Sequence, residues 1–127
     1  MRHTKAASAS AGNSSRIAYR VYQDPAVYAA ELENVFYGPT WNYVGLSAEI
    51  PNVGDWRRTM IGEREVLVVR KPKNQFSILP NVCAHRGSQI CQARNGNTDN
   101  AFMCPYHQWT YDYDGKLVGV PFRRGVK

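Results

Sequence analysis

Four side chains able to bind a metal, arranged in two short pairs, constrain this chain more than any other feature of its sequence. Cys83 and His85 form the first pair, and Cys104 and His107 form the second, with residues 86–103 between them. The 127-residue chain contains only three Cys and three His, so the two pairs use most of both residue types. A site built from both pairs receives two thiolate sulfurs and two imidazole nitrogens.

Two kinds of metal centre accept this ligand set. A Rieske [2Fe-2S] cluster is held by two Cys on one iron and two His on the other, whereas a single Zn²⁺ also binds two sulfurs and two nitrogens. Zinc modules usually take two Cys from one turn and two His from another, but here each pair is mixed. Mixed pairs suit a dinuclear cluster better, because each pair then contributes to both irons. A third reading, that all four are ordinary packed or polar residues, is disfavoured by their spacing.

The sequence around these pairs resembles the Rieske domain of the large (alpha) subunit of aromatic-ring-hydroxylating dioxygenases. Residues 83–87 and 104–117 carry the resemblance, and residues 31–41 resemble the helix that precedes the Rieske domain in those subunits. The similarity covers about residues 22–127. One departure is Gln108, where the family more often has Gly. This variant resembles members that act on aromatic carboxylates.

The resemblance implies a [2Fe-2S] cluster held by Cys83, His85, Cys104 and His107, with no catalytic residue in this chain. Alpha subunits of this family are several times longer, because a second domain holds a mononuclear Fe(II) bound by two His and a carboxylate. With two His used by the cluster, only His3 remains, so the chain lacks ligands for that second iron. We therefore expect an N-terminal fragment of an oxygenase subunit, which relays electrons to an iron site in an absent catalytic domain.

The same resemblance implies the partners of the chain. A ferredoxin or a reductase donates the electrons, and the chain's own catalytic domain and a beta subunit complete the oligomer. The whole enzyme is expected to hydroxylate or dihydroxylate an aromatic substrate. A free Rieske ferredoxin is the alternative function, and a zinc-binding structural module is a third class. The helix before the domain and the sequence after Cys104 favour the alpha subunit over the ferredoxin.

Charge and cysteine content bear on partners and compartment. The net charge is +6, but basic residues are scattered, with no run longer than Arg57-Arg58 or Arg123-Arg124. This pattern lacks the basic stripe of a nucleic-acid-binding protein, and leaves open attraction of an acidic redox partner or plain surface solvation. Cys91 has no partner for a disulfide once the other two Cys bind the cluster, which favours the reducing cytoplasm.

The chain divides into three predicted segments, a disordered N-terminal extension, a helix and a Rieske domain, at residues 1–21, 22–40 and 41–127. The extension is rich in Ala and Ser and has no acidic residue before position 17. Asp24 and Pro25 are typical of a helix start, and Gly38 of a helix end. No membrane span is predicted, because apolar runs such as residues 66–69 are far shorter than the roughly 20 residues a spanning helix needs.

Beyond residue 41, short β-rich runs alternate with turn signals, which predicts an all-β module of stacked antiparallel sheets. The predicted strands are residues 41–46, 57–61, 65–70, 76–79, 101–104, 108–113 and 116–120. Asp114-Gly115 predicts a two-residue hairpin turn, and residues 95–97 read as the tip of a turn. The two ligand pairs are expected in the loops at the ends of two hairpins.

Residues next to the ligands predict the redox potential. The respiratory Rieske type resembles this chain around the cluster but has a Ser two residues after the second ligand His, where this chain has Trp109. Among nearby residues, only Tyr111 retains a comparable hydroxyl donor. Because donors to the cluster sulfurs raise the potential, we expect a value nearer about −150 mV than about +300 mV. Tyr106 and Trp109 are also large enough to shield the cluster from water.

Overall fold

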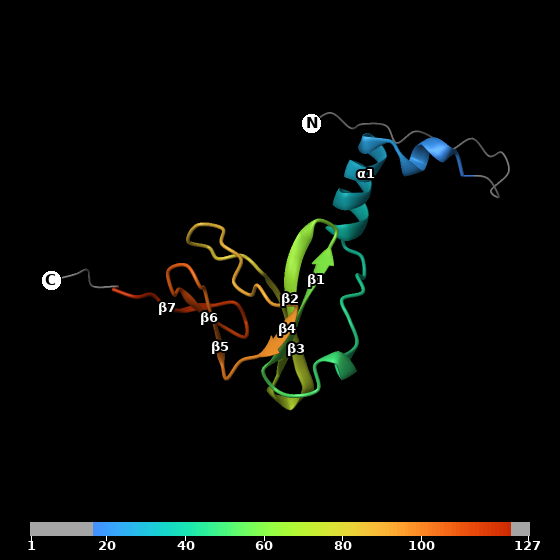
Figure 1. Ribbon diagram of the computed structural model, residues 1–127. Helices are drawn as coiled ribbons and strands as arrows, with labels where there is room; N and C mark the ends of the chain where they lie inside the picture. The colour runs from blue at the N-terminus through green and yellow to red at the C-terminus, as the bar shows by residue number, and fades with distance from the viewer. Residues whose placement is uncertain (1–16, 123–127) are drawn as a thin grey trace.

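The computed structural model describes residues 17–122, which form two antiparallel β-sheets with a helix at one end (Figure 1). The larger sheet has the strand order β3-β2-β1-β4, and its strands are β1 (Asp55–Ile61), β2 (Arg64–Lys71), β3 (Gln75–Pro80) and β4 (Asn95–Asn97). The smaller sheet has the order β5-β6-β7, with β5 at Ala101–Met103, β6 at Thr110–Asp112 and β7 at Leu117–Gly119. The predicted all-β class with antiparallel sheets is confirmed. Most of the predicted extension, residues 1–16, lies outside the described residues.

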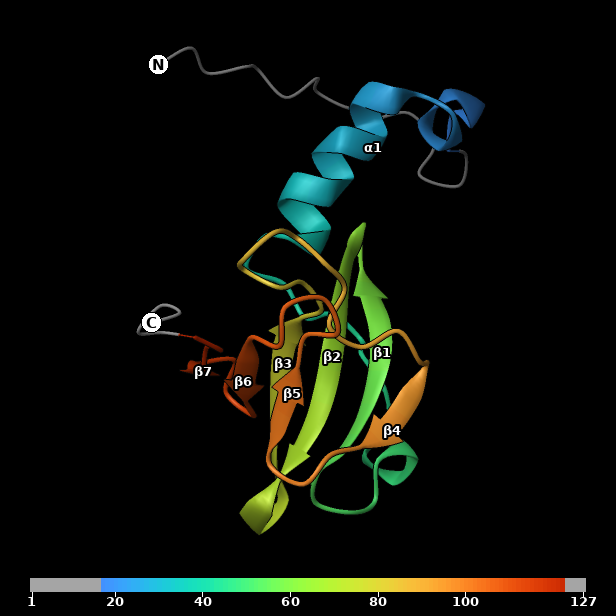
Figure 2. The same ribbon diagram turned by 60° about the vertical axis from the view of Figure 1, so that its left-hand side comes forward.

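The main hydrophobic core joins the two sheets. In the central strand β2, alternate side chains Leu67 and Val69 face this core, and both are almost completely buried. Trp56 lies opposite Val69 on the neighbouring strand β1. Phe102 comes from β5 of the smaller sheet and packs edge-on against Trp56, with ring centroids 6.3 Å apart. Phe102 therefore links the smaller sheet to the larger one, and Figure 2 shows the smaller sheet beside the larger one.

The N-terminal helix begins where the sequence predicts. The side chain of Asp24 accepts a hydrogen bond of 2.9 Å from the N–H of Ala26, which caps the first turn of α1 (Pro25–Glu31). The helix continues as a π-helical turn (Leu32–Phe36), and short 3-10 helices lie at Tyr19–Tyr22, Ser47–Glu49 and Pro72–Asn74. None of the helices in residues 17–122 is long and apolar enough to cross a membrane.

The far end of this helix packs on the turn between β1 and β2. Glu63 in this turn accepts a hydrogen bond from the hydroxyl of Tyr28 (3.1 Å), and its N–H donates to the hydroxyl of Tyr37 (3.0 Å). Gly62 has a φ of +56°, and a Cβ at this position would lie 2.9 Å from Leu32 Cδ2. The turn therefore requires glycine both for its backbone conformation and for close contact with the helix.

Two predicted elements differ from the structure. Residues 41–46 are not a strand, because this segment crosses the larger sheet without pairing with any strand and Trp41 is fully exposed. Asn95–Asn97 is not a turn tip but strand β4, paired with β1. Gly96 lies against the Trp56 ring, and a Cβ there would be 2.8 Å from the ring. Contact with a distant tryptophan places this weak strand former in the sheet.

The turn between β6 and β7 is one residue earlier than predicted. The N–H of Gly115 donates to the carbonyl of Asp112 (3.0 Å), so Tyr113 and Asp114 occupy the turn. Gly115 follows them with a φ of +76°. This is the longer hairpin connection in which a glycine in the left-handed region follows the turn.

Candidate metal centre

The four predicted ligands lie in two loops, which we call the first arm (residues 83–88) and the second arm (residues 104–109). The second arm connects β5 to β6 and is a hairpin loop, as predicted. The first arm lies between β3 and β4, which occupy opposite edges of the larger sheet. The chain must cross two intervening strands here, so the first arm belongs to a crossover connection and the prediction of a hairpin loop was wrong for it.

Both arms are closed by the same backbone hydrogen bond. The N–H of Cys83 donates to the carbonyl of Ser88, and the N–H of Cys104 donates to the carbonyl of Trp109, both at 2.8 Å. In each arm the acceptor lies five residues after the cysteine. Each ligand pair is therefore held inside a small closed loop.

A second shared feature is the backbone conformation four residues after each cysteine. At this position the N–H of Gly87 donates to the carbonyl of Cys83 (2.9 Å), and that of Gln108 donates to the carbonyl of Cys104 (3.0 Å). Gly87 has a φ of +70° and Gln108 a φ of +58°. The left-handed conformation favours glycine, so Gln108 occupies a backbone position that glycine would adopt with less strain.

The two thiols lie together in the interior. Cys83 and Cys104 are 2% and 1% exposed and pack with Tyr111. The Tyr111 hydroxyl lies 3.2 Å from Cys83 Sγ and accepts a 3.0 Å hydrogen bond from the N–H of Ala84. Burial and the hydrogen bond with Cys83 raise the pKa of Tyr111, so its hydroxyl keeps its proton at neutral pH. The tyrosine can thus donate to a sulfur that carries negative charge.

The second arm favours the thiolate form of its cysteine. Burial alone would raise the pKa of Cys104. Hydrogen bonds from the backbone N–H groups of Tyr106 and His107, together with contacts to the Cys83 and Ser88 side chains, outweigh that effect and lower the pKa below its ordinary value. A thiolate is the form that binds a metal.

The two imidazoles also form a pair. The rings of His85 and His107 have centroids 4.7 Å apart and lie at 71° to each other. Nδ1 of both rings is buried and has no hydrogen-bond partner in the described part of the chain. Burial, followed by the positive potential of His85 and Arg86, lowers the pKa of His107 and favours the neutral imidazole that binds metals. A bond from Nδ1 to a metal would supply the partner that each of these nitrogens lacks.

The arrangement of the donors fits a dinuclear group. Within residues 17–122, no three side chains of His, Cys, Asp or Glu gather closely enough to hold one metal ion. The donors are instead sorted by type, with thiol beside thiol and imidazole beside imidazole. A cluster in which one iron takes two Cys and the other takes two His requires this sorting.

Comparison with known proteins agrees with this geometry. The family model of the Rieske [2Fe-2S] domain matches residues 40–127. The chain belongs to the Rieske [2Fe-2S] domain family. This assignment sets the zinc reading aside and makes the [2Fe-2S] cluster the cofactor of this Rieske domain.

Relatives of this Rieske domain are large subunits of oxygenases. It is 54% identical over 114 residues to the large oxygenase component of salicylate 5-hydroxylase from Ralstonia sp, covering 90% of this chain and 27% of that protein. It is 50% identical to the large subunit of anthranilate 1,2-dioxygenase from Burkholderia cepacia, covering 89% of this chain and 26% of that protein. The crystal structure of naphthalene 1,2-dioxygenase from Rhodococcus sp. bound to indole superposes with a TM-score of 0.70 at 39% identity, covering 82% of this chain and 24% of that one. The Rieske domain thus spans about a quarter of the length of these relatives.

Aromatic rings surround the two imidazoles of the Rieske domain. The ring of Trp109 stacks on that of His85, with centroids 4.7 Å apart and planes 8° apart. The ring of Tyr106 lies 3.8 Å from that of His107. A pocket of about 360 Å³ next to both imidazoles is lined further by Gln108, Pro121 and Phe122. The predicted shielding residues therefore contact the imidazole pair, while one side of the pair stays near solvent.

The remaining cysteine of the Rieske domain is a packing residue. Cys91 is half-buried against the main core. Burial raises its pKa to about 11, which keeps the thiol protonated and unreactive at neutral pH. None of the three cysteines, all within residues 17–122, forms a disulfide, and His3, the remaining histidine, lies outside the described residues.

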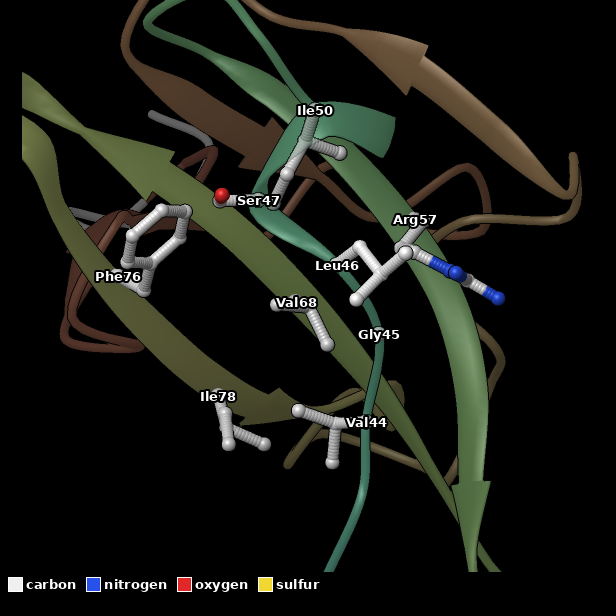
Figure 3. A pocket seen from close by; sticks show the side chains of 9 residues that line it. All are labelled: Val44, Gly45, Leu46, Ser47, Ile50, Arg57, Val68, Phe76 and Ile78. Carbon is white, nitrogen blue, oxygen red and sulfur yellow. The ribbon is translucent and has the colours of Figure 1, made fainter.

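A second pocket lies on the opposite face of the larger sheet from the main core (Figure 3). Its volume is about 320 Å³, and its side chains come from the segment before β1 and from the three longer strands. Val44 and Leu46 face Val68 and Ile78 across it, with Arg57 at one side. It contains no cysteine or histidine, so it takes no part in the metal centre.

Proposed function

We propose that this chain is the electron-transfer domain of an aromatic-ring-hydroxylating oxygenase alpha subunit. In this proposal Cys83 and Cys104 bind one iron of the cluster, and Nδ1 of His85 and of His107 bind the other. The pair of buried, unpartnered Nδ1 atoms beside the pair of buried thiols carries the proposal. When bound, the [2Fe-2S] cluster accepts and donates one electron at a time.

The surrounding residues support this role in distinct ways. Burial of both cysteines keeps water from the sulfurs. The N–H of Ala84 fills an acceptor position of the Tyr111 hydroxyl, which directs the hydroxyl proton toward Cys83 Sγ. The imidazoles instead line an open pocket, which gives electrons a short path to a partner.

For the whole protein, we propose an aromatic carboxylate as substrate. The identities of 54% to a relative named for salicylate and of 50% to one named for anthranilate support this choice. The presence of Gln108 agrees with this choice. The hydroxylation itself belongs to a mononuclear non-haem Fe(II) in a catalytic domain outside residues 17–122. We further propose a ferredoxin or reductase as electron donor, assembly with a beta subunit, and a cytoplasmic location.

Cluster analysis tests this function. The reconstituted chain is expected to contain about two irons and two acid-labile sulfides, to be reducible by an electron donor, and to leave salicylate unchanged. Cys83→Ala removes a proposed ligand and is expected to abolish cluster binding. Cys91→Ala is the matched control and is expected to keep the cluster, because Cys91 lies in the packed core. Stoichiometric zinc without labile sulfide in the unmodified chain would overturn the proposal.

A further inference from the structure

Asn81 is the one buried side chain among residues 17–122 that is an amide or carries a charge, and it lies two residues before a proposed ligand. Its Nδ2 donates to the carbonyl of Cys91 (2.8 Å) and to Oε1 of Glu65 (2.6 Å), and its Oδ1 accepts from the N–H of Cys91 (2.8 Å). Its backbone N–H donates to the carbonyl of Glu65 (3.0 Å). Both protons of the Asn81 side-chain amide therefore have acceptors, so the buried group has no unpaired donor.

The contact between Asn81 and Cys91 closes the segment that contains Cys83 and His85. Residues 82–90 lie between its two ends, and no β-strand occurs between Pro80 and Asn95. The asparagine side chain pairs with both the N–H and the carbonyl of Cys91, as a neighbouring strand would. The Asn81 side chain therefore replaces the strand pairing that this crossover lacks. The loop that it closes, from residue 81 to residue 91, encloses the smaller loop closed by the hydrogen bond between Cys83 and Ser88.

Glu65 joins this segment to the larger sheet. Its Oε1 accepts a second hydrogen bond from Nε2 of Gln89 (2.6 Å), the residue directly after the first arm. Its Oε2 lies 3.4 Å from Nε of Arg58 on β1. Arg58 also donates to the carbonyl of Gln92 (3.0 Å). The Glu65 carboxylate on β2 thus contacts Asn81 before the first arm, Gln89 after it, and Arg58 on β1.

We propose that Asn81 is a positioning residue that, through Glu65, fixes Cys83 and His85 relative to the second arm and so sets the redox potential and the retention of the cluster. The inference rests on the proposed function. The two arms come from different sheets, and each holds one sulfur and one nitrogen donor, so a shift of the first arm displaces a ligand of both irons. Residues that orient metal ligands typically change metal affinity or activity by about 10–100-fold when replaced.

Asn81→Asp tests this inference in the reconstituted protein. The substitution keeps the shape but replaces the donor Nδ2 by an oxygen that faces the Glu65 carboxylate and the Cys91 carbonyl. We expect iron loss to a chelator to become about 10–100-fold faster, with a shifted midpoint potential and an altered electron paramagnetic resonance spectrum of the reduced protein. Adding Glu65→Gln supplies an amide donor to the new carboxylate but leaves its contact with the Cys91 carbonyl unpaired, so a partial recovery of all three properties is expected.

Tyr113→Phe is the matched control, because it removes a hydrogen bond of 2.6 Å from the Tyr113 hydroxyl to the Thr98 carbonyl without touching Asn81 or Glu65. It is expected to lower the thermal midpoint and leave the potential and spectrum unchanged. The inference fails if Asn81→Asp behaves like this control. Should Asn81→Asp not fold, Asn81→Ser, which removes the side-chain hydrogen bonds of Asn81 to Glu65 and Cys91 without adding a charge, provides the same readouts.

The two proposals fail in distinguishable ways. An unmodified chain without labile sulfide removes the proposed function, and this inference with it. If the unmodified chain has a normal cluster but its potential and iron loss do not respond to Asn81→Asp or Asn81→Ser, only the positioning role of Asn81 is refuted.

Discussion

At the scale of single residues, two side-chain hydroxyls contact the proposed sulfur ligands in the described part of the chain, Ser88 beside Cys104 and Tyr111 beside Cys83. The position of Tyr111 was predicted from the spacing after His107, and the structure places its hydroxyl 3.2 Å from Cys83 Sγ. Trp109 stacks flat on His85 and so covers the imidazole side of the centre. Hydrogen bonds to the sulfurs therefore come from Tyr111, from Ser88 and from backbone N–H groups, and the low potential expected from the sequence stays a prediction.

Replacing Tyr111 by Phe is expected to lower the midpoint potential further. The lost hydrogen bond stabilises the more negative, reduced state, and a difference of about 1 kcal/mol between the two states corresponds to roughly 40 mV for one electron. Protein-film voltammetry at neutral pH measures the shift, with Tyr113→Phe as control. A potential that stays constant or rises would show that the Tyr111 hydroxyl does not donate to the cluster sulfurs.

At the scale of secondary structure, elements that depend on neighbouring residues were predicted correctly, and elements that depend on long-range contacts were not. Asp24 and Pro25 mark the helix start because capping depends on neighbouring residues only. Residues 41–46 have strand-forming side chains but meet no free strand edge, so their propensity does not produce a strand. Gly96 belongs to a strand because Trp56 packs against it, and this contact between distant residues leaves no local signal in the sequence.

Gly62→Ala is expected to detach the helix from the turn between β1 and β2. The added Cβ would lie 2.9 Å from Leu32 and 3.1 Å from Phe36, in a backbone conformation that itself disfavours alanine. We expect the free energy of unfolding to fall by about 1–3 kcal/mol and amide hydrogen exchange in residues 25–36 to become faster. Gly87→Ala is the control: Gly87 has a similar positive φ, but a Cβ there would have no atom within 4 Å. This variant therefore introduces backbone strain without steric overlap. Equal exchange rates in the two variants would refute the close contact.

At the scale of the whole molecule, the proposed ligand set follows from a local pattern, whereas the path of the chain between the arms could not be predicted. Cys83, His85, Cys104 and His107 stand out because their spacing is a local pattern with a known chemistry. The crossover that carries the first arm depends on the strand order of the larger sheet, which no short pattern encodes. The role of Asn81 was missed for the same reason, since its partner Glu65 lies on another strand.

Phe102→Ala is expected to destabilise the whole protein. Phe102 joins the smaller sheet to the core of the larger one, and truncation of a buried Phe typically costs about 3–5 kcal/mol. Since small domains have a total stability of about 5–15 kcal/mol, a denaturant titration should show a large fall in the unfolding midpoint. Phe76→Ala, on the opposite and partly exposed face, is the control and should have a much smaller effect. Similar midpoints would mean that the sheets are not joined through Phe102.

The mixed composition of the two arms makes the cofactor a cross-link between the sheets. In the proposed ligand set, each iron receives one ligand from the crossover after β3 and one from the β5–β6 hairpin. Opening either arm therefore releases one bond from both irons at once. Loss of the cluster should consequently be all-or-none, with no accumulation of protein that retains a single iron. Loss of the cluster should also coincide with separation of the smaller sheet from the larger one, so that cluster release and unfolding form one cooperative transition.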